Sequence, residues 1–171
     1  MAQTASFTGQ VVLAPNFKHY GASDLSNPTE LIGTLYSQVM ASGTGANQMN
    51  MLWHDQRSLA ATTGEDLDLA GSLVNSFGVT MTFVRVKFLY IGAASANNGL
   101  IQVGGAAGNQ FINWVADASD IANVRAGGFV CLFAPDATAY AVTATTGDIL
   151  KVYNSGAAAG TYDIIIGGCS A

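Results

Sequence analysis

Beyond residue 48, apolar residues recur at every second position through most of the chain, which is the period of a β-strand. Met49, Met51 and Trp53 show this spacing, and so do Leu67 and Leu69, which alternate with acidic residues. Strands of this kind bury one face and turn the other to solvent. The pattern therefore predicts half-buried strands rather than helices over most of the sequence.

The strongest predicted strand covers residues 79–91. Its alternation predicts one face formed by Val84, Val86, Phe88 and Tyr90 and the other by Arg85, Lys87, Leu89 and Ile91. Further short strands, most of them bounded by turn residues such as Asn-Gly and Gly-Gly, are predicted at 99–103, 110–114, 129–133, 140–143, 148–153 and 162–166. About eight strands with only one helical turn among them, at 70–77, predict an all-β chain closed as an antiparallel sandwich or barrel.

The first 48 residues show a less regular pattern. Residues 26–39 begin with the chemistry of a helix start, a capping residue followed by Pro28 and Glu30, and then place leucine or valine at every fourth position. The same residues also favour an extended strand, because a glycine interrupts them and β-branched and aromatic residues follow. We predict residues 1–48 to form an N-terminal arm, extended or partly helical, with the first strand or strands, and 49–171 to form the β-sandwich.

Low charge is the most informative feature of the composition. Charged residues make up 10% of the 171 residues and hydrophobic residues 50%, whereas a typical soluble domain is about one quarter charged. A neutral surface of small side chains loses little hydration energy when it is buried. The composition therefore predicts a protein that packs against copies of itself or against a larger assembly.

Charge and hydropathy also exclude several classes of partner. The net charge is −5 and no run of Lys or Arg occurs, which argues against direct contact with nucleic acid. The most apolar stretch, 79–94, is interrupted by Arg85 and Lys87 and is too short to span a bilayer. The N-terminus has neither the basic nor the apolar region of a secretory leader, so we expect synthesis in a cytosol and no membrane partner.

One polar constellation, residues 53–57, suggests chemistry. His54 is, with His19, one of two imidazoles that could serve as a catalytic base, and Trp53 could stack on a sugar. The alternative is an Asp55–Arg57 ion pair at a strand end, with Trp53 in the core or at a subunit contact. We favour the ion pair, because no nucleophile motif accompanies the histidine.

Three further features have ordinary structural explanations. In the acidic cluster Glu65, Asp66 and Asp68, strand geometry places Asp66 and Asp68 on one face, where they could share a hard cation. We favour the alternative, in which leucines face the core and the acids face water. The glycine-rich segment 104–108 lacks the lysine and the following helix of a phosphate-binding loop and is predicted to be a hairpin loop. The spacing of His and Cys does not suit zinc. We therefore predict no catalytic, cofactor-binding or metal-binding residues.

The two cysteines allow two interpretations. Cys131 lies in an apolar run and Cys169 in the last segment of the chain. A disulfide between them would tether the final strand, whereas a cytosolic protein would keep both thiols reduced. We favour two free thiols, with Cys131 buried.

Several sequence strings together resemble the small structural proteins of tailed bacteriophage heads. They are LYSQV (35–39), TGEDLDLAGSL (63–73), FGVTMTF (77–83), RAGG (125–128), APD (134–136), TGDILKVYNSGA (146–157) and TYDIIIG (161–167). The resemblance covers roughly the last three quarters of the chain and is weakest over the first forty residues. It rests on the pattern as a whole rather than on any one string.

The resemblance implies a jelly-roll decoration (cement) protein with no enzymatic activity. Such proteins commonly form trimers that bind the major capsid protein between capsomers, on the outer surface of the phage head, and reinforce the shell. One alternative is a tail or fibre-tip protein that binds a host glycan, for which Trp53, Trp114 and Tyr140 are the candidate exposed aromatics. A second alternative is a polysaccharide-degrading enzyme, which would need paired carboxylates or a histidine site in a cleft.

Overall fold

The computed structural model describes residues 6–20 and 29–171, and every regular element within them is a β-strand. The all-β prediction is therefore confirmed, and in the described residues no helix is long and apolar enough to cross a membrane. In chain order the strands are β1 (Gly9–Leu13), β2 (Phe17–Tyr20), β3 (Thr29–Ile32), β4 (Tyr36–Ser42), β5 (Gln48–Met49), β6 (Met51–Leu59), β7 (Gly64–Asp68), β8 (Arg85–Ala93), β9 (Ile101–Gly104), β10 (Ile121–Val124), β11 (Phe129–Phe133), β12 (Tyr140–Ala141), β13 (Ile149–Asn154) and β14 (Gly160–Cys169).

Both helical predictions are wrong where the structure describes the chain. The proposed helix start at 26–28 lies outside the described residues, but the segment that follows it forms the extended strands β3 and β4. The predicted turn of helix at 70–77 is a series of turns. There the side-chain oxygen of Asn75 accepts the backbone N–H groups of Phe77 and Val79, each at 3.0 Å. An Asn that bonds to nearby backbone in this way offers the chain an alternative to helical hydrogen bonds.

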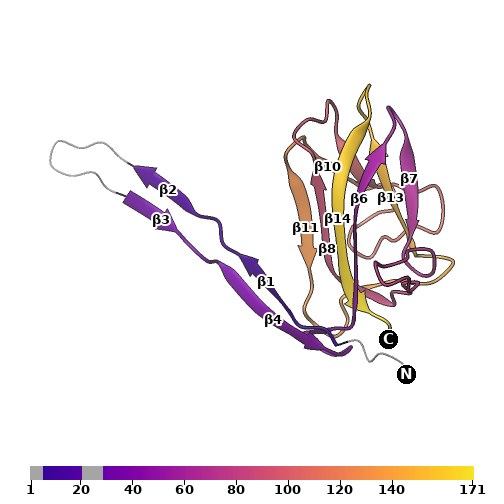
Figure 1. Cartoon of the computed structure of the whole chain (residues 1–171), viewed down its shortest axis with the longest axis horizontal. Helices are drawn as coiled ribbons and strands as arrows, with labels where there is room; N and C mark the ends of the chain where they lie inside the picture. Colours follow the sequence, from indigo (N-terminus) through magenta and orange to yellow (C-terminus); the bar gives the residue numbers. More distant parts are fainter. Residues whose placement is uncertain (1–5, 21–28) are drawn as a thin grey trace.

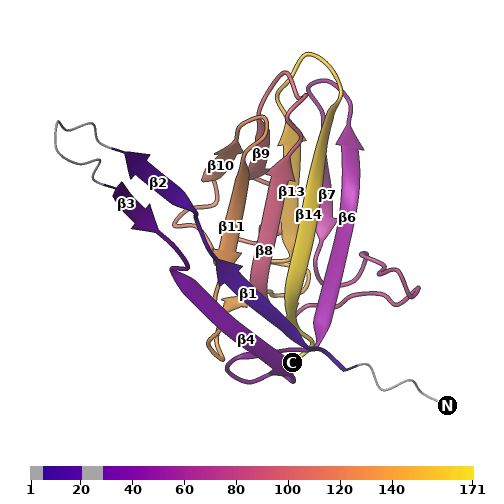
Figure 2. The same cartoon turned by 60° about the vertical axis from the view of Figure 1, so that its left-hand side comes forward.

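From β6 onward the chain forms a sandwich of two antiparallel sheets (Figure 2). The first sheet has the order β11-β8-β14-β6, with β12 added beside β8, and the second has the order β10-β9-β13-β7. Their facing sides bury a single apolar core, because successive side chains on each strand point to opposite faces. Among the fully buried side chains of this core are Leu89, Ile91, Ile101, Leu150, Val152, Ile164 and Ile166.

Strand β8 contains a bulge that changes which residues face the core. Across β14, Gly167 pairs with Phe88 but Gly168 pairs with Val86, so Lys87 is an extra residue in the ladder. The extra residue places Val86 in the core while Phe88 turns to the outer face of the sheet. The prediction that these two residues share a face is wrong for this reason. Gly168 is required at the bulge, because a Cβ there would lie 2.1 Å from the carbonyl oxygen of Arg85.

Most of the other predicted strands are confirmed in place. β11 matches its prediction residue for residue, and β9, β12, β13 and β14 overlap theirs. The predicted strand at 110–114 is wrong, because these residues belong to the long connection between β9 and β10. Phe111 is buried there in the core, and its carbonyl oxygen accepts the indole N–H of Trp114 at 2.9 Å. The glycine-rich segment 104–108 opens this connection.

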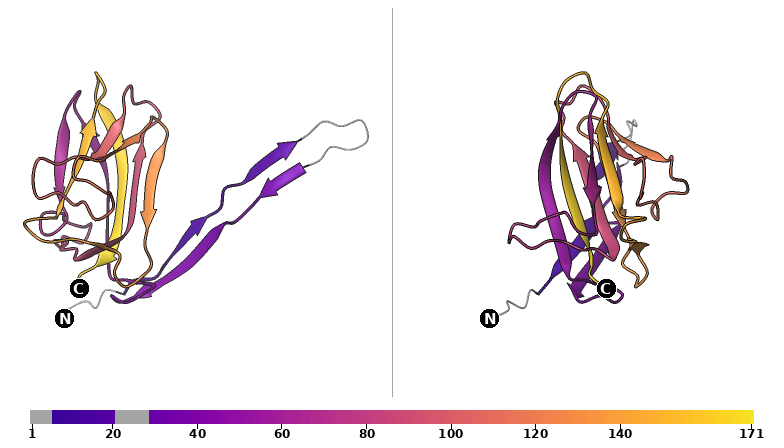
Figure 3. Two further views of the ribbon diagram at one scale, coloured as in Figure 1. Left: turned by 180° about the vertical axis from the view of Figure 1, so that it is seen from behind. Right: turned by 90° about the vertical axis from the view of Figure 1, so that its right-hand side faces the viewer.

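The N-terminal strands form a hairpin arm, β1 to β4, that leaves the sandwich (Figures 1 and 3). Near the sandwich β1 pairs with β4, and farther out β2 pairs with β3. The arm is fixed at its root, where Met40 is fully buried and the buried Lys87 ammonium donates a hydrogen bond to the carbonyl oxygen of Gly45. The backbone N–H of Asn47 adds a 2.7 Å hydrogen bond to the carbonyl oxygen of Pro135. The root is thus bound to the sandwich, and the rest of the arm extends away from it.

Candidate interaction site between the arm and the sandwich

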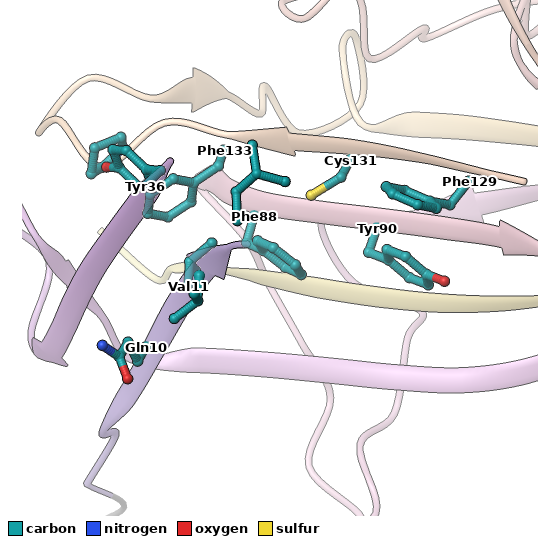
Figure 4. Close-up of a pocket in the computed structure, with 11 residues that line it drawn as sticks. Gln10, Val11, Tyr36, Phe88, Tyr90, Phe129, Cys131 and Phe133 are labelled. Carbon is teal, nitrogen blue, oxygen red and sulfur yellow. The ribbon is translucent and has the colours of Figure 1, made fainter. Parts of the chain in front are cut away.

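An apolar groove lies between the arm and the outer face of the sandwich (Figure 4). Its volume is about 860 Å³, and β1 and β4 form one wall while β8 and β11 form the other. None of the described residues that line it is charged. The lining residues are Gln10, Val11, Val12, Leu13, Tyr36, Phe88, Tyr90, Phe129, Cys131, Phe133 and Pro135.

The wall on the sandwich is an aromatic surface. In the β11–β8 register Cys131 lies opposite Tyr90 and Phe133 opposite Phe88, so these side chains share the outer face. The rings of Tyr90 and Phe129 stack with their centroids 5.6 Å apart, and those of Phe88 and Phe133 meet edge to face at 6.4 Å. Phe129 remains 63% exposed. An outward sheet face normally carries polar residues. This face instead has the composition of a sheet face that packs against another protein surface.

The wall on the arm contacts the aromatic surface through Tyr36. Val11, Leu13 and Tyr36 share a face of the β1–β4 hairpin, because Leu13 pairs with Tyr36 and Val11 lies two residues before Leu13. The ring of Tyr36 meets the ring of Phe133 edge to face, with 5.8 Å between centroids. The ribbons of the arm and of the sandwich diverge with distance from the root of the arm (Figure 1).

Residues 53–57 form a structural ion pair, as we favoured. Arg57 binds Asp55 at 3.0 Å and also Glu65, which lies on β7 of the other sheet. The buried hydroxyl of Tyr162 donates a 2.8 Å hydrogen bond to Glu65. Burial and this hydrogen bond raise the pKa of Tyr162 well above its usual range, and the hydrogen bond to Glu65 raises the pKa of Arg57. The cluster therefore ties the two sheets together at the edge where β6 and β7 meet.

The two histidines and the acidic residue Asp68 do not add a reactive group to the ion-pair cluster. His54 lies on the exposed face of β6, and nothing is described of the side chain of His19. Leu67 and Leu69 are buried as predicted, while a side-chain oxygen of Asp68 accepts the N–H of Ala70 at 2.8 Å. Within the described residues no group of three or more His, Cys, Asp or Glu side chains is placed to hold a metal ion.

The aromatics proposed as a glycan platform do not form one. Trp53 is only 3% exposed, and its indole N–H donates to the carbonyl oxygen of Val74 at 3.1 Å. Trp114 and Tyr140 are half-buried and pack against the core. An aromatic surface lines the groove instead.

The cysteines are both free, and they lie in different environments. Cys169 is buried, as expected of an unreactive thiol, and burial raises its pKa. Cys131 is exposed in the groove, so the prediction that it is buried is wrong. The burial of part of this side chain still raises its pKa, which lowers its thiolate fraction at neutral pH.

Sequence reasoning missed the groove, although one pattern indicates it. A strand with one solvated face shows a polar residue at every second position, and residues 129–133, Phe-Val-Cys-Leu-Phe, show none. Such a run predicts a strand covered on both faces. Comparison with known proteins does not identify what packs on the outer face of this strand, since no protein-family model, no curated protein and no solved structure matches this chain.

Proposed function

We propose that this chain is a structural subunit of a virion, a capsid decoration (cement) protein that binds the major capsid protein between capsomers and stabilises the head of a tailed bacteriophage. The observation that carries the proposal is the apolar arm above an uncharged groove. Both surfaces are suited to burial against protein rather than to catalysis or to a polar ligand. The family resemblance supplies the phage head as the assembly.

The jelly-roll architecture is part of this proposal. The eight long strands of the sandwich, β6 to β11, β13 and β14, can be counted from first to eighth along the chain. One sheet then places the first strand beside the eighth, followed by the third and the sixth, and the other has the order second, seventh, fourth and fifth. A jelly roll has eight strands arranged as two Greek keys, and this strand order supports that architecture.

The mechanism we propose is mechanical. A surface with few charges loses little hydration energy on burial, so many modest contacts, repeated over a shell, add up to firm attachment. A homotrimer would allow each copy to cover the exposed strands of its neighbour. The net charge of −5 gives the protein no attraction to the packaged genome, which supports a position on the outer surface of the head.

The glycan-binding alternative loses its main argument. It required Trp53, Trp114 and Tyr140 to be exposed on one concave face, and the first is buried while the others pack against the core. We assign no catalytic, cofactor-binding or metal-binding residue to the chain.

Shell binding tests the proposed function. Heads assembled from the major capsid protein of the same genome would be incubated with the purified chain and sedimented. We expect the chain to sediment with the heads at a saturable ratio and to raise the temperature at which they disrupt. Phe129→Glu, which adds a charge to the groove, should reduce binding, whereas Phe77→Glu, at a site 86% exposed outside the arm and groove, should not. Failure of the unmodified chain to bind heads would contradict the proposal.

A further inference from the structure

We propose that the apolar groove of each copy is filled by the distal arm of a second copy, so that the chain assembles by exchange of its arms. The distal arm is defined here as residues 16–20 and 29–35, the part beyond the β1–β4 hairpin. The inference deepens the proposed function, on which its setting in the phage head rests, by naming the contact that joins one copy to the next.

The distal arm exposes large apolar side chains to solvent. Its apolar side chains Phe17, Leu31, Ile32 and Leu35 are all exposed, Phe17 to 66% and Leu31 to 64%. An isolated two-stranded hairpin is at best marginally stable in water. Fully burying one such side chain stabilises a structure by about 1.5–3 kcal/mol. A surface that covers the distal arm would therefore stabilise it.

Large apolar side chains lie on both faces of the distal arm. Across the β2–β3 ladder Phe17 pairs with Ile32 and Lys18 with Leu31, so one large apolar side chain or more lies on each face. One face of a hairpin can pack on one sheet, and the second face then needs another surface. The arm is therefore suited to lie between two protein surfaces rather than along one.

The groove matches the distal arm in chemistry and form. It is uncharged and apolar, and it is bordered by two strands with unpaired edges, β1 of the arm and β11 of the sandwich. An open strand edge can pair with an added strand of another chain. Lys18 in the distal arm can keep its ammonium group in water while its methylene stem lies on apolar surface.

The geometry favours a second copy over the same chain. The distal arm continues the hairpin whose near end forms one wall of the groove, and the Leu35 N–H bonds the Leu13 carbonyl oxygen at 2.9 Å where the two parts meet. The hairpin thus carries its own far end away from the groove (Figure 1). A second copy supplies both surfaces in equal number. Reciprocal insertion of two arms closes a two-fold dimer, and insertion in one direction closes into a ring when the rotation between copies allows.

Cross-linking tests the exchange, and the groove already holds a thiol for it. A cysteine placed by Leu31→Cys would lie beside the exposed Cys131 of the neighbouring copy, while Cys169 is buried. Treatment with a short bismaleimide should yield covalent multimers on a denaturing gel. The double variant Leu31→Cys/Cys131→Ser should lose them, and Phe77→Cys, at a more exposed site away from the arm, should not form them.

Three outcomes would overturn the arm exchange. They are the absence of multimers, a cross-link confined within single chains, and an equal yield of multimers from Phe77→Cys. Light scattering gives a second, independent measurement: the unmodified chain should have the mass of a multimer, Phe129→Glu that of a monomer, and Phe77→Glu that of the multimer. An unmodified chain with the mass of a monomer at high concentration would also contradict the inference.

Shell binding separates this inference from the proposed function. A chain that cross-links through its arm but does not sediment with heads would retain the arm exchange and overturn the decoration function. A chain that sediments with heads but does not cross-link would retain the decoration function and overturn the arm exchange.

Discussion

The sandwich and the arm consist of the same kind of strand but use their apolar residues in opposite ways. In the sandwich, residues such as Leu89 and Ile164 are buried between two sheets, and each strand except those at the edges is paired on both sides. In the described part of the arm, only the root residue Met40 is fully buried, and half of the large apolar side chains that the described residues expose belong to this one hairpin. The sandwich has the features of a unit that folds alone, whereas the arm has those of a surface awaiting a partner.

The comparison predicts that truncating a core aromatic has the largest effect. Phe83→Ala should lower the free energy of unfolding by about 3–5 kcal/mol, because Phe83 is 1% exposed and its removal leaves a cavity. Urea denaturation monitored by tryptophan fluorescence would measure this. The matched change in the arm, Phe17→Ala, should alter the same quantity by less than about 0.5 kcal/mol. Similar losses at both sites would show that the arm folds as part of the sandwich.

Deleting the arm should have the reverse effect. A chain lacking residues 1–35 should keep its free energy of unfolding within about 1 kcal/mol, because the core side chains remain. Its association, with copies or with heads, should weaken by at least about 2 kcal/mol, since six large exposed apolar side chains are removed. Sedimentation analysis measures association, and an unfolded product would place the deleted strands within the core.

A smaller change in the free energy of unfolding is expected at the cluster of Arg57, Glu65 and Tyr162 that joins the two sheets. Tyr162→Phe removes the hydroxyl that donates to Glu65 but preserves the buried ring, so unfolding should become easier by about 1.5 kcal/mol. Arg57 continues to bind Glu65 and limits the loss. Calorimetry would measure the change in melting temperature, and an unchanged value would show that the hydroxyl contributes no net stability.

The same tyrosine predicts a pH dependence confined to alkaline solution. Burial raises the pKa of Tyr162 in the folded state above the value of about 10 expected when the chain is unfolded. The contribution of the neutral hydroxyl is therefore present below pH ~10 and is lost as the pH rises further, by up to about 1.4 kcal/mol per pH unit. Denaturation from pH 8 to 11 should show this loss in the unmodified chain, and the difference between that chain and Tyr162→Phe should shrink over the same range.

The sequence predicted the sandwich well because its strands obey a local rule. Alternation places Leu67 and Leu69 in the core, and an apolar run preceded by turn residues identifies β11 to the residue. The errors occur where distant contacts decide the conformation. The bulge at Lys87 exists because β14 lacks a matching residue, and Phe111 enters the core from a loop rather than from a strand. No local pattern contains that information.

The interaction site was harder to predict because it depends on the path of the arm. Pairing across the arm, such as Val12 with Ser37, links residues far apart in the chain and selects the extended alternative over the helical one. The aromatic wall of the groove was visible as an unbroken apolar run, which we interpreted as interior. What the sequence alone does not show is that β11 lies at a sheet edge with the arm above it.

The position of β14 has a consequence for the order of events during synthesis. It is the last strand along the chain, yet it lies between β6 and β8 and pairs with both. The first sheet therefore cannot close until β14 has left the ribosome, which at roughly 5–20 residues per second is many seconds after the arm has emerged. During that interval the arm and the unpaired sides of β6 and β8 are exposed together. Crowding of several ribosomes on one message would bring nascent arms and open sheets close enough to aggregate, and chaperone binding to the growing chain would protect the yield of folded protein.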